Sequence, residues 1–234
     1  TGQVVEHHSV GDNGPLSEDN NIWTLEVLRS GQLWIGSNTG VVLFDADNKR
    51  FTPFKRQQIS ASISDILQDR QGKIWLSSGS GLFLFDPVTE DFRSFAVDPN
   101  SRNTINANFL SHSYESNNGI VWISTQFGIA FYDPTAKKFK HYRQPSYENN
   151  VISNDVTAIY EDADGILWLG TSTGGLNRFD RRTGAFRYFS TNSKKQVAAN
   201  RNKVFAIREG KNNELWIATQ EGLNRFDKKT KIFE

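Results

Sequence analysis

Cysteine and methionine are both absent from this chain of 234 residues. Without cysteine, the chain can form neither a disulfide framework nor a zinc site built on thiolates. No apolar run approaches the roughly 20 residues that a membrane-spanning helix needs. The 27 basic and 26 acidic residues are well mixed, so the sequence has neither a basic stripe for nucleic acid nor a polybasic membrane anchor.

A segment built around a tryptophan, in contrast, recurs five times. The five tryptophans, separated by 41, 47, 46 and 48 residues, are Trp34, Trp75, Trp122, Trp168 and Trp216. Each copy contains four short apolar or alternating runs bounded by turn residues, which is typical of short antiparallel strands. A period of this size with this content predicts an all-β β-propeller, with one four-stranded antiparallel blade in each repeat.

Two further anchors keep nearly fixed offsets from each tryptophan. A glycine, or Asn213 in the last copy, lies three residues before it, where a tight hairpin needs a positive φ. An aromatic–Asp pair follows ten or eleven residues after it, and its aspartates are Asp45, Asp86, Asp133, Asp180 and Asp227. We expect each aspartate to open a hairpin turn by accepting backbone hydrogen bonds. The aromatic anchors are expected to fill the gaps between blades.

The repeats make residues 1–234 a single propeller region. Its expected parts are an orphan outer strand at 1–10 and blades at 20–56, 61–97, 107–143, 154–190 and 202–234. Since the first residues align with the outer strand of the fourth copy, we expect a piece of a longer protein. Two geometries stay open: a closed five-bladed ring completed by the orphan strand, or an arc of a larger propeller of about seven blades. An open arc would associate through its edges, for example as a homodimer.

The fourth and fifth copies carry a specific motif. Residues 167–180 read Leu-Trp-Leu-Gly-Thr-Ser-Thr-Gly-Gly-Leu-Asn-Arg-Phe-Asp, and residues 215–227 read Leu-Trp-Ile-Ala-Thr-Gln-Glu-Gly-Leu-Asn-Arg-Phe-Asp. Both resemble the two-component regulator propeller repeat. The resemblance covers essentially the whole chain and implies a periplasmic sensor module of a bacterial membrane receptor, whose output domain is a histidine kinase or a diguanylate cyclase. It implies no catalysis by this chain, and membrane attachment only through segments outside it.

Motifs for catalysis or for metal binding do not emerge from the sequence. There is no nucleophile elbow, no phosphate-binding loop and no His-Glu-x-x-His, and the four histidines are His7, His8, His112 and His141. Residues 161–165, Glu-Asp-Ala-Asp-Gly, suggest a calcium loop but lack the spaced oxygen ligands and the terminal glutamate. We expect a polar hairpin turn there, and neither a metal nor a cofactor in the chain.

The remaining candidate site is positional. Propeller ligands usually meet the mouth of the central channel, where the inner strands begin and the loops between blades converge. The residue before the first hydrophobic residue of each inner strand is polar, and these are Asn21, Ser62, Asn108, Asp155 and Lys203. His112 on an inner strand, with Arg102 and Tyr147 on long loops, completes the predicted ligand site. The same ring could also be a solvated rim.

Three functions follow from these observations. The first is a non-enzymatic sensor that binds a small molecule or a glycan. The second is a metal-dependent enzyme of the antibiotic-inactivating lyase type, because those seven-bladed propellers have similar tryptophan-containing repeats; His112 with Asp155 is the only pair that could serve it. The third is a platform for protein–protein interaction.

Overall fold

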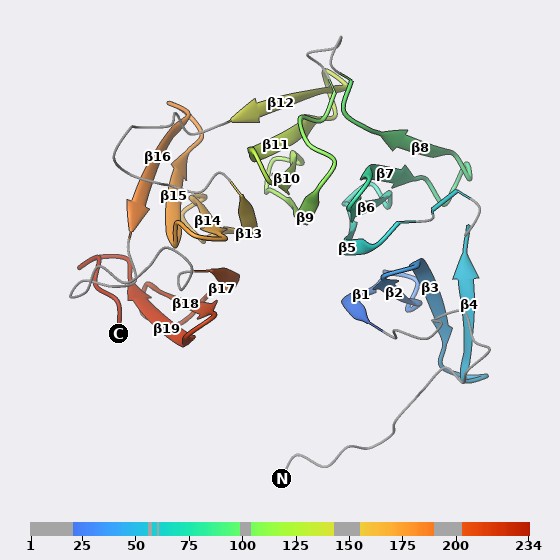
Figure 1. Cartoon of the computed structure of the whole chain (residues 1–234), viewed down its shortest axis with the longest axis horizontal. Helices are drawn as coiled ribbons and strands as arrows, with labels where there is room; N and C mark the ends of the chain where they lie inside the picture. The colour runs from blue at the N-terminus through green and yellow to red at the C-terminus, as the bar shows by residue number, and fades with distance from the viewer. Residues whose placement is uncertain (1–20, 56–57, 60, 99–103, 143–154, 190–202) are drawn as a thin grey trace.

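The structure, a computed structural model, describes residues 21–55, 58–59, 61–98, 104–142, 155–189 and 203–234. The predicted orphan strand at 1–10, with His7 and His8, and the predicted site residues Arg102 and Tyr147 lie outside these ranges. Within them, the strands form five antiparallel sheets that follow one another along the chain (Figure 1). We call these sheets blades 1 to 5. The described residues include no helix with the length and apolarity needed to span a membrane.

Four blades have four strands each, in sequential order. Blade 1 contains β1 (Ile22–Val27), β2 (Leu33–Ser37), β3 (Gly40–Asp45) and β4 (Arg50–Phe54); blade 2 contains β5 (Ile63–Gln68), β6 (Ile74–Ser78), β7 (Gly81–Phe85) and β8 (Phe92–Phe95). Blade 3 contains β9 (Leu110–Glu115), β10 (Val121–Thr125), β11 (Gly128–Asp133) and β12 (Lys138–Tyr142); blade 4 contains β13 (Val156–Glu161), β14 (Leu167–Thr171), β15 (Leu176–Asp180) and β16 (Ala185–Phe189).

Blade 5 has three strands among the described residues, β17 (Val204–Glu209), β18 (Glu214–Thr219) and β19 (Gly222–Asp227). A single bridge between Phe226 and Phe233 stands where the fourth strand pairs in the other blades. Beside this bridge, Arg225 and Glu234 exchange two backbone hydrogen bonds of 2.8 Å.

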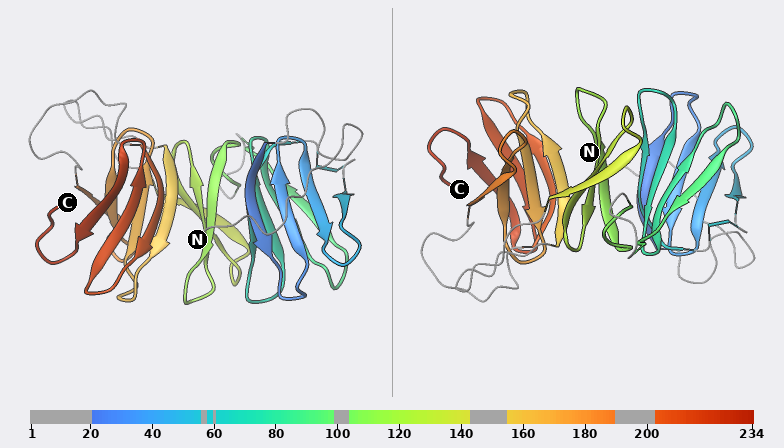
Figure 2. Two further views of the ribbon diagram at one scale, coloured as in Figure 1. Left: turned by 90° about the horizontal axis from the view of Figure 1, so that it is seen from below. Right: turned by 90° about the horizontal axis from the view of Figure 1, so that it is seen from above.

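The five blades stand around a common axis and form a propeller arc. The first strand of each blade faces the axis, and neighbouring blades pack through the pairs β1–β5, β5–β9, β9–β13 and β13–β17 (Figure 1). The blades are seen side by side in Figure 2. A gap separates blade 5 from blade 1 in Figure 1. Among the described strands, β17 and β1 are not a packing pair.

The repeat tryptophans fill the space between successive blades, as predicted. Each of the first four packs against the following blade: Trp75, for example, lies 5.1 Å from Tyr132 of blade 3, centroid to centroid. Trp34, Trp75, Trp122 and Trp168 are only 2–3% exposed, whereas Trp216 in blade 5 is 39% exposed. At the other end of the arc, the outer face of blade 1 is also uncovered, since Leu25 is 59% exposed. Both end faces of the arc are therefore apolar and accessible.

The turns also follow the predicted chemistry. The glycine before each of the first four tryptophans has φ between +74° and +85°, and Asn213 in blade 5 has φ +65°. Each aspartate of the aromatic–Asp pairs accepts two backbone N–H groups, as Asp180 does from Arg182 and Thr183. These hydrogen bonds lower the pKa of Asp180. The repeat anchors therefore act locally, by fixing turns that place the strands.

Candidate functional site

The predicted ring of polar residues lies at the inner edge of the arc. Asn21, Ser62, Asp155 and Lys203 directly precede β1, β5, β13 and β17. In blades 2, 4 and 5 the ring residue's carbonyl accepts an N–H from the turn that follows the second strand, at 2.9–3.2 Å. The backbone of this ring is thus held by the scaffold, which leaves its side chains to vary.

Blade 3 corrects the predicted ring. Leu110 pairs with Thr125 as Ile63 of blade 2 pairs with Ser78, so Phe109 occupies the ring position. Asn108 lies one residue earlier, and its Oδ1 accepts the backbone N–H of Val97 at 3.1 Å. The sequence offered two adjacent hydrophobic residues, Phe109 and Leu110, and the strand begins at the second of them.

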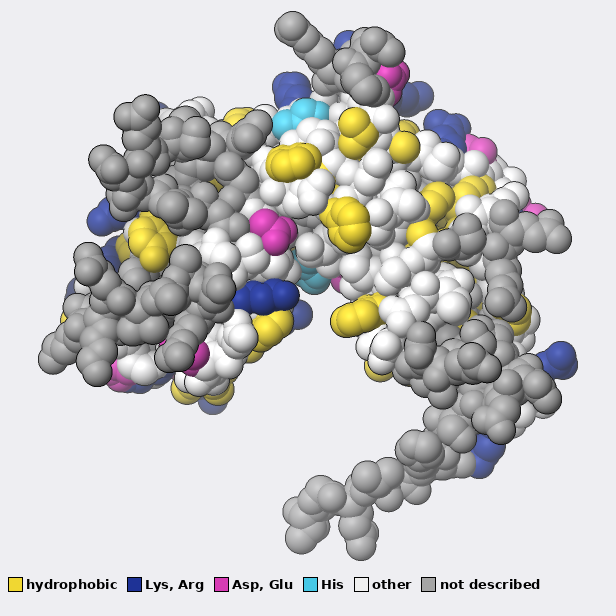
Figure 3. All heavy atoms as spheres, in the orientation of Figure 1, with side chains coloured by type: hydrophobic (Ala, Val, Ile, Leu, Met, Phe, Trp, Pro, Cys, Tyr) yellow, Lys and Arg dark blue, Asp and Glu magenta, His cyan; other side chains and the backbone are white. Residues whose placement is uncertain are grey.

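Exposed aromatic side chains lie at or beside this inner edge. Trp23, Phe109 and Phe205 are 59%, 65% and 54% exposed and belong to three different blades. The Lys203 ammonium lies 5.2 Å from the centroid of the Phe205 ring, within cation–π distance. Figure 3 shows hydrophobic, basic and acidic side chains, together with a histidine, around the concave edge of the arc. These aromatics fall outside the repeat anchors, and sequence analysis missed them.

Signals for two of these aromatics were present in the sequence. Trp23 and Phe205 occupy the second position of the inner strand, where blades 2 and 4 have Ser64 and Thr157. Those two hydroxyls donate to the carbonyls of Leu110 and Val204 in the next blade, each at 2.6 Å. Blades 1 and 5 thus differ from blades 2 and 4, because a large aromatic side chain replaces the hydroxyl that donates a hydrogen bond to the next blade.

His112 lies against Asp65 of the neighbouring blade, with its Nδ1 3.2 Å from Asp65 Oδ1, and the two form an ion pair when the imidazole is protonated. Asp65 Oδ2 accepts the backbone N–H of Ser113 at 2.7 Å and its hydroxyl at 2.6 Å. Burial acts to lower the pKa of His112, but the attraction and the hydrogen bond of Asp65 outweigh it, so that the pKa is raised; Arg208 opposes this rise. The histidine predicted for the site is thus held by Asp65, which sequence analysis did not name.

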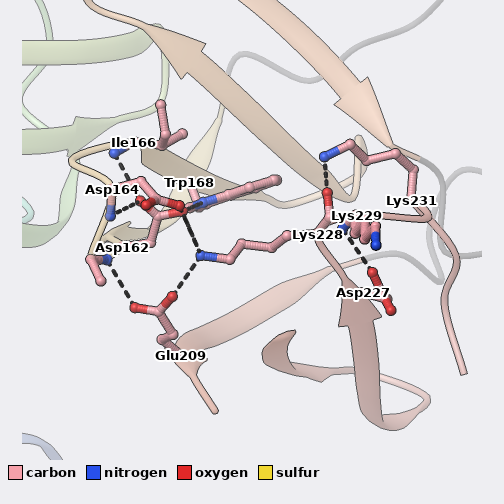
Figure 4. Close-up of polar contacts among 10 residues, drawn as sticks. Asp162, Asp164, Ile166, Trp168, Glu209, Asp227, Lys228, Lys229 and Lys231 are labelled. Carbon is pink, nitrogen blue, oxygen red and sulfur yellow. Dashed lines mark hydrogen bonds and ion pairs between the residues drawn. The ribbon is translucent and has the colours of Figure 1, made fainter. Parts of the chain in front are cut away.

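A second polar cluster lies at the other end of the inner strands, between blades 4 and 5 (Figure 4). The Lys228 ammonium donates to Asp162 Oδ2 at 3.0 Å and to Glu209 Oε1 at 2.6 Å. Asp162 Oδ1 accepts the backbone N–H groups of Asp164 and Ile166, and Oδ2 also accepts the Trp168 indole N–H at 2.8 Å. The segment that suggested a calcium loop is the expected hairpin turn.

Burial and hydrogen bonding act in opposite directions on the pKa values of Asp162 and Lys228. Burial raises the pKa of Asp162, but the hydrogen bonds from Trp168, Ile166 and Lys228 lower it by more, so the pKa ends below its usual value. Burial lowers the pKa of Lys228, but Glu209 and Asp162 more than offset this, so the net pKa is raised. Asp162 and Lys228 are therefore both charged at neutral pH and form an ion pair. Within the described part of the chain, no group of three or more His, Asp or Glu side chains is arranged to hold a metal ion.

Comparison with known proteins places this fold. The family model described as "Two component regulator propeller" matches residues 57–80 and 150–173. The extracellular domain of a hybrid two-component system from B. thetaiotaomicron superposes with a TM-score of 0.77 at 23% identity, over 93% of this chain and 30% of that chain. No curated protein matches the chain in sequence.

Two other solved structures share the fold. PorZ, a surface component of the type-IX secretion system of Porphyromonas gingivalis, matches with a TM-score of 0.68 at 17% identity, over 95% of this chain and 34% of that chain. Virginiamycin B lyase from Staphylococcus aureus matches with a TM-score of 0.67 at 15% identity, over 94% of this chain and 70% of that chain. The chain spans about a third of the two-component system's extracellular domain and about a third of PorZ. The comparisons together show an all-β propeller fold with two-component regulator propeller repeats at residues 57–80 and 150–173.

Proposed function

We propose that this chain is a ligand-recognition part of the periplasmic sensor region of a bacterial two-component receptor and is not itself catalytic. The observation that carries the proposal is the repeat match together with the likeness to the extracellular domain of a hybrid two-component system. The kinase or cyclase output, and any membrane anchor, would belong to other segments of such a receptor. Signalling then requires that a ligand bind two receptor arrangements with different affinities.

The inner edge of the arc supports ligand binding better than the outer surface does. It offers Lys203 and Asp155 on a fixed backbone, with exposed Trp23, Phe109 and Phe205 nearby. Exposed aromatic faces combined with a few charged groups suit a small molecule or a glycan, because they supply both apolar contact and orienting polar contacts. We infer that the ligand lies across several blades at this mouth of the channel.

A thermal-shift screen against glycans, amino acids, nucleotides and divalent metals tests this proposal. A ligand present at 100 times its dissociation constant adds about 2.7 kcal/mol to the free energy of unfolding. For a chain of this size, the melting temperature would rise by about 5 to 10 °C. A hit among the organic classes supports the sensor. Folded protein that responds to none of them contradicts small-molecule sensing and favours the interaction platform.

The lyase-type alternative rests on two observations. Virginiamycin B lyase shares the fold, and Asp65 orients His112, as acidic residues often orient a catalytic histidine. The His112→Ala substitution distinguishes the alternatives. A metal-dependent lyase activity that disappears in this variant would establish the enzyme. Ligand binding without turnover, in both the wild type and the variant, would exclude it.

A further inference from the structure

The contacts between blades repeat a glutamate at the end of the inner strand. In blades 3, 4 and 5 these are Glu115, Glu161 and Glu209. One carboxylate oxygen of each accepts a backbone N–H from the preceding blade, at 2.8–3.1 Å. In blades 4 and 5 the other oxygen contacts the residue that directly follows the aromatic–Asp pair of the same blade. In blade 3 Glu115 lines a pocket together with the equivalent residue, Pro134. The three interfaces can therefore be compared residue by residue.

Two of these interfaces fill that position with a cation. Between blades 4 and 5, Lys228 follows Asp227 and donates to Glu209 Oε1 and Asp162 Oδ2 (Figure 4). Between blades 3 and 4, Arg181 follows Asp180 and its guanidinium lies 2.5 Å from Glu161 Oε1. The chain thus supplies its own cation to the glutamate in both places.

The interface between blades 2 and 3 has the same acceptors without the cation. Asp69 repeats the hydrogen bonds of Asp162: Oδ1 accepts the N–H groups of Gln71 and Lys73, and Oδ2 accepts the Trp75 indole N–H at 2.8 Å. Glu115 Oε2 accepts the Arg70 N–H, as Glu209 does from Ala163. The residue that follows the aromatic–Asp pair is Pro134, however, which carries no charge. Among the described residues, none donates to Glu115 Oε1.

Space is available where the lysine would lie. A pocket of about 550 Å³ opens at this interface, and Asp69, Glu115 and Pro134 line it together with the aromatic rings of Trp75 and Tyr132. Asp69 itself is only 5% exposed. The pocket thus presents a buried carboxylate, a second carboxylate and an aromatic floor on which an alkyl chain can pack.

The other charges of the pocket largely pair with one another. Arg93 lies 2.7 Å from Asp91, and Lys73 lies 3.8 Å from Asp86. Lys137 also lines the wall; within the described part of the chain, it forms no ion pair with either Asp69 or Glu115. The two carboxylates that match the Lys228 site are therefore left without a neutralising side chain.

We propose that the Asp69–Glu115 pocket binds a primary ammonium group carried by an external ligand. The Lys228 site shows that this pair of acceptors holds an ammonium, and charge-assisted hydrogen bonds of this kind are the stronger ones. A calcium ion would need six to eight oxygen ligands, more than the two carboxylates supply. The pocket lies at the ends of the inner strands opposite to the channel mouth, so it is a separate site from the one proposed above.

The Trp75 indole N–H, which donates to Asp69 Oδ2, is a direct reporter of this site. The probe is Nα-acetyl-lysine methylamide, whose only charge is the side-chain ammonium. Its Nε-acetylated form, which has no charge, is the control. We expect the Trp75 indole signal in a ¹H–¹⁵N correlation spectrum, assigned with the Trp75→Phe variant, to shift saturably with the amine and not with the acetylated control.

Two variants test the assignment from opposite directions. Glu115→Gln should weaken binding about tenfold by removing a charged acceptor. Pro134→Lys should supply the missing lysine from within, raise the melting temperature and abolish the shift. Asp155→Asn/Lys203→Gln should leave it unchanged, which separates this site from the channel mouth.

The proposal is wrong if no shift occurs up to about 50 mM amine, well above the dissociation constant of a weak millimolar contact. It is also wrong if the acetylated control shifts the signal equally, if calcium shifts it and the amine does not, or if both Glu115→Gln and Pro134→Lys bind like the wild type. The last outcome keeps the test valid should one variant fail to fold.

Discussion

Lys228 places its ammonium 3.0 Å from Asp162 Oδ2, and the two side chains are only 6% and 1% exposed. The Lys228→Met substitution would leave the Asp162 carboxylate buried beside Glu209 without its cation. Removing one partner of a buried ion pair costs about 3–5 kcal/mol of unfolding free energy. Urea unfolding measures this loss. The matched control is Lys229→Met, on the exposed neighbour, which should change stability by less than about 0.5 kcal/mol. Equal effects of the two substitutions would contradict this role of Lys228.

The His112–Asp65 pair predicts a pH-dependent stability. The pKa of His112 is raised in the folded protein because Asp65 outweighs the effect of burial. The stabilisation is therefore complete below the unfolded pKa of about 6.5 and is lost as the pH rises through the higher folded pKa. The difference in unfolding free energy between the wild type and His112→Asn should be larger at about pH 5.5 than at about pH 8.5. A difference that does not vary with pH would contradict the ion pair.

The uncovered ends of the arc predict self-association. Leu25 on blade 1 and Leu223 on blade 5 are 59% and 66% exposed, on faces whose counterparts are buried in the inner blades. Exposed apolar faces of this kind tend to associate. Sedimentation equilibrium should detect concentration-dependent dimers or larger species, and Leu25→Glu/Leu223→Glu should shift them to monomer. A wild-type chain that stays monomeric at all concentrations would contradict this prediction.

Close packing between blades 4 and 5 leaves no room for a side chain at Gly170. A Cβ there would lie 2.4 Å from Val204 Cγ1 and 2.6 Å from its Cβ. Gly170→Ala must push the blades apart, and overpacking of this kind costs about 1–3 kcal/mol. The control is Gly79→Ala, whose Cβ would meet only the Phe109 ring, at 3.8 Å. Similar melting temperatures for the two variants would show that the blades are packed loosely.

The fold could be predicted because its determinants are local and repeated. The glycine turns, the aspartate turns and the tryptophans keep nearly fixed offsets, and each acts within a few residues of its own position. A positive φ at Gly165 and the N–H contacts of Asp180 need no knowledge of the rest of the chain. Five copies of the same pattern then specify five blades.

The site could be predicted only in part, because its contacts join different repeats. Asp65 reaches His112 across a blade interface, and Lys228 reaches Asp162 in the same way, 66 residues away in sequence. No spacing rule within one repeat reveals these pairs. The choice of Asn108 over Phe109 failed for a different reason: a one-residue ambiguity in the start of a strand changes which residue faces the channel mouth.

The channel mouth is the central claim, and a binding titration tests it most directly. The dissociation constant of an organic hit from the thermal-shift screen is measured for the wild type, for Asp155→Asn/Lys203→Gln, and for Asp47→Asn/Arg182→Gln on exposed turns as a control. We predict binding weakened about tenfold or more by the first pair, because charged contacts are lost, and unchanged by the second. Equal dissociation constants for all three proteins, each with an unchanged melting temperature, would contradict recognition at the channel mouth.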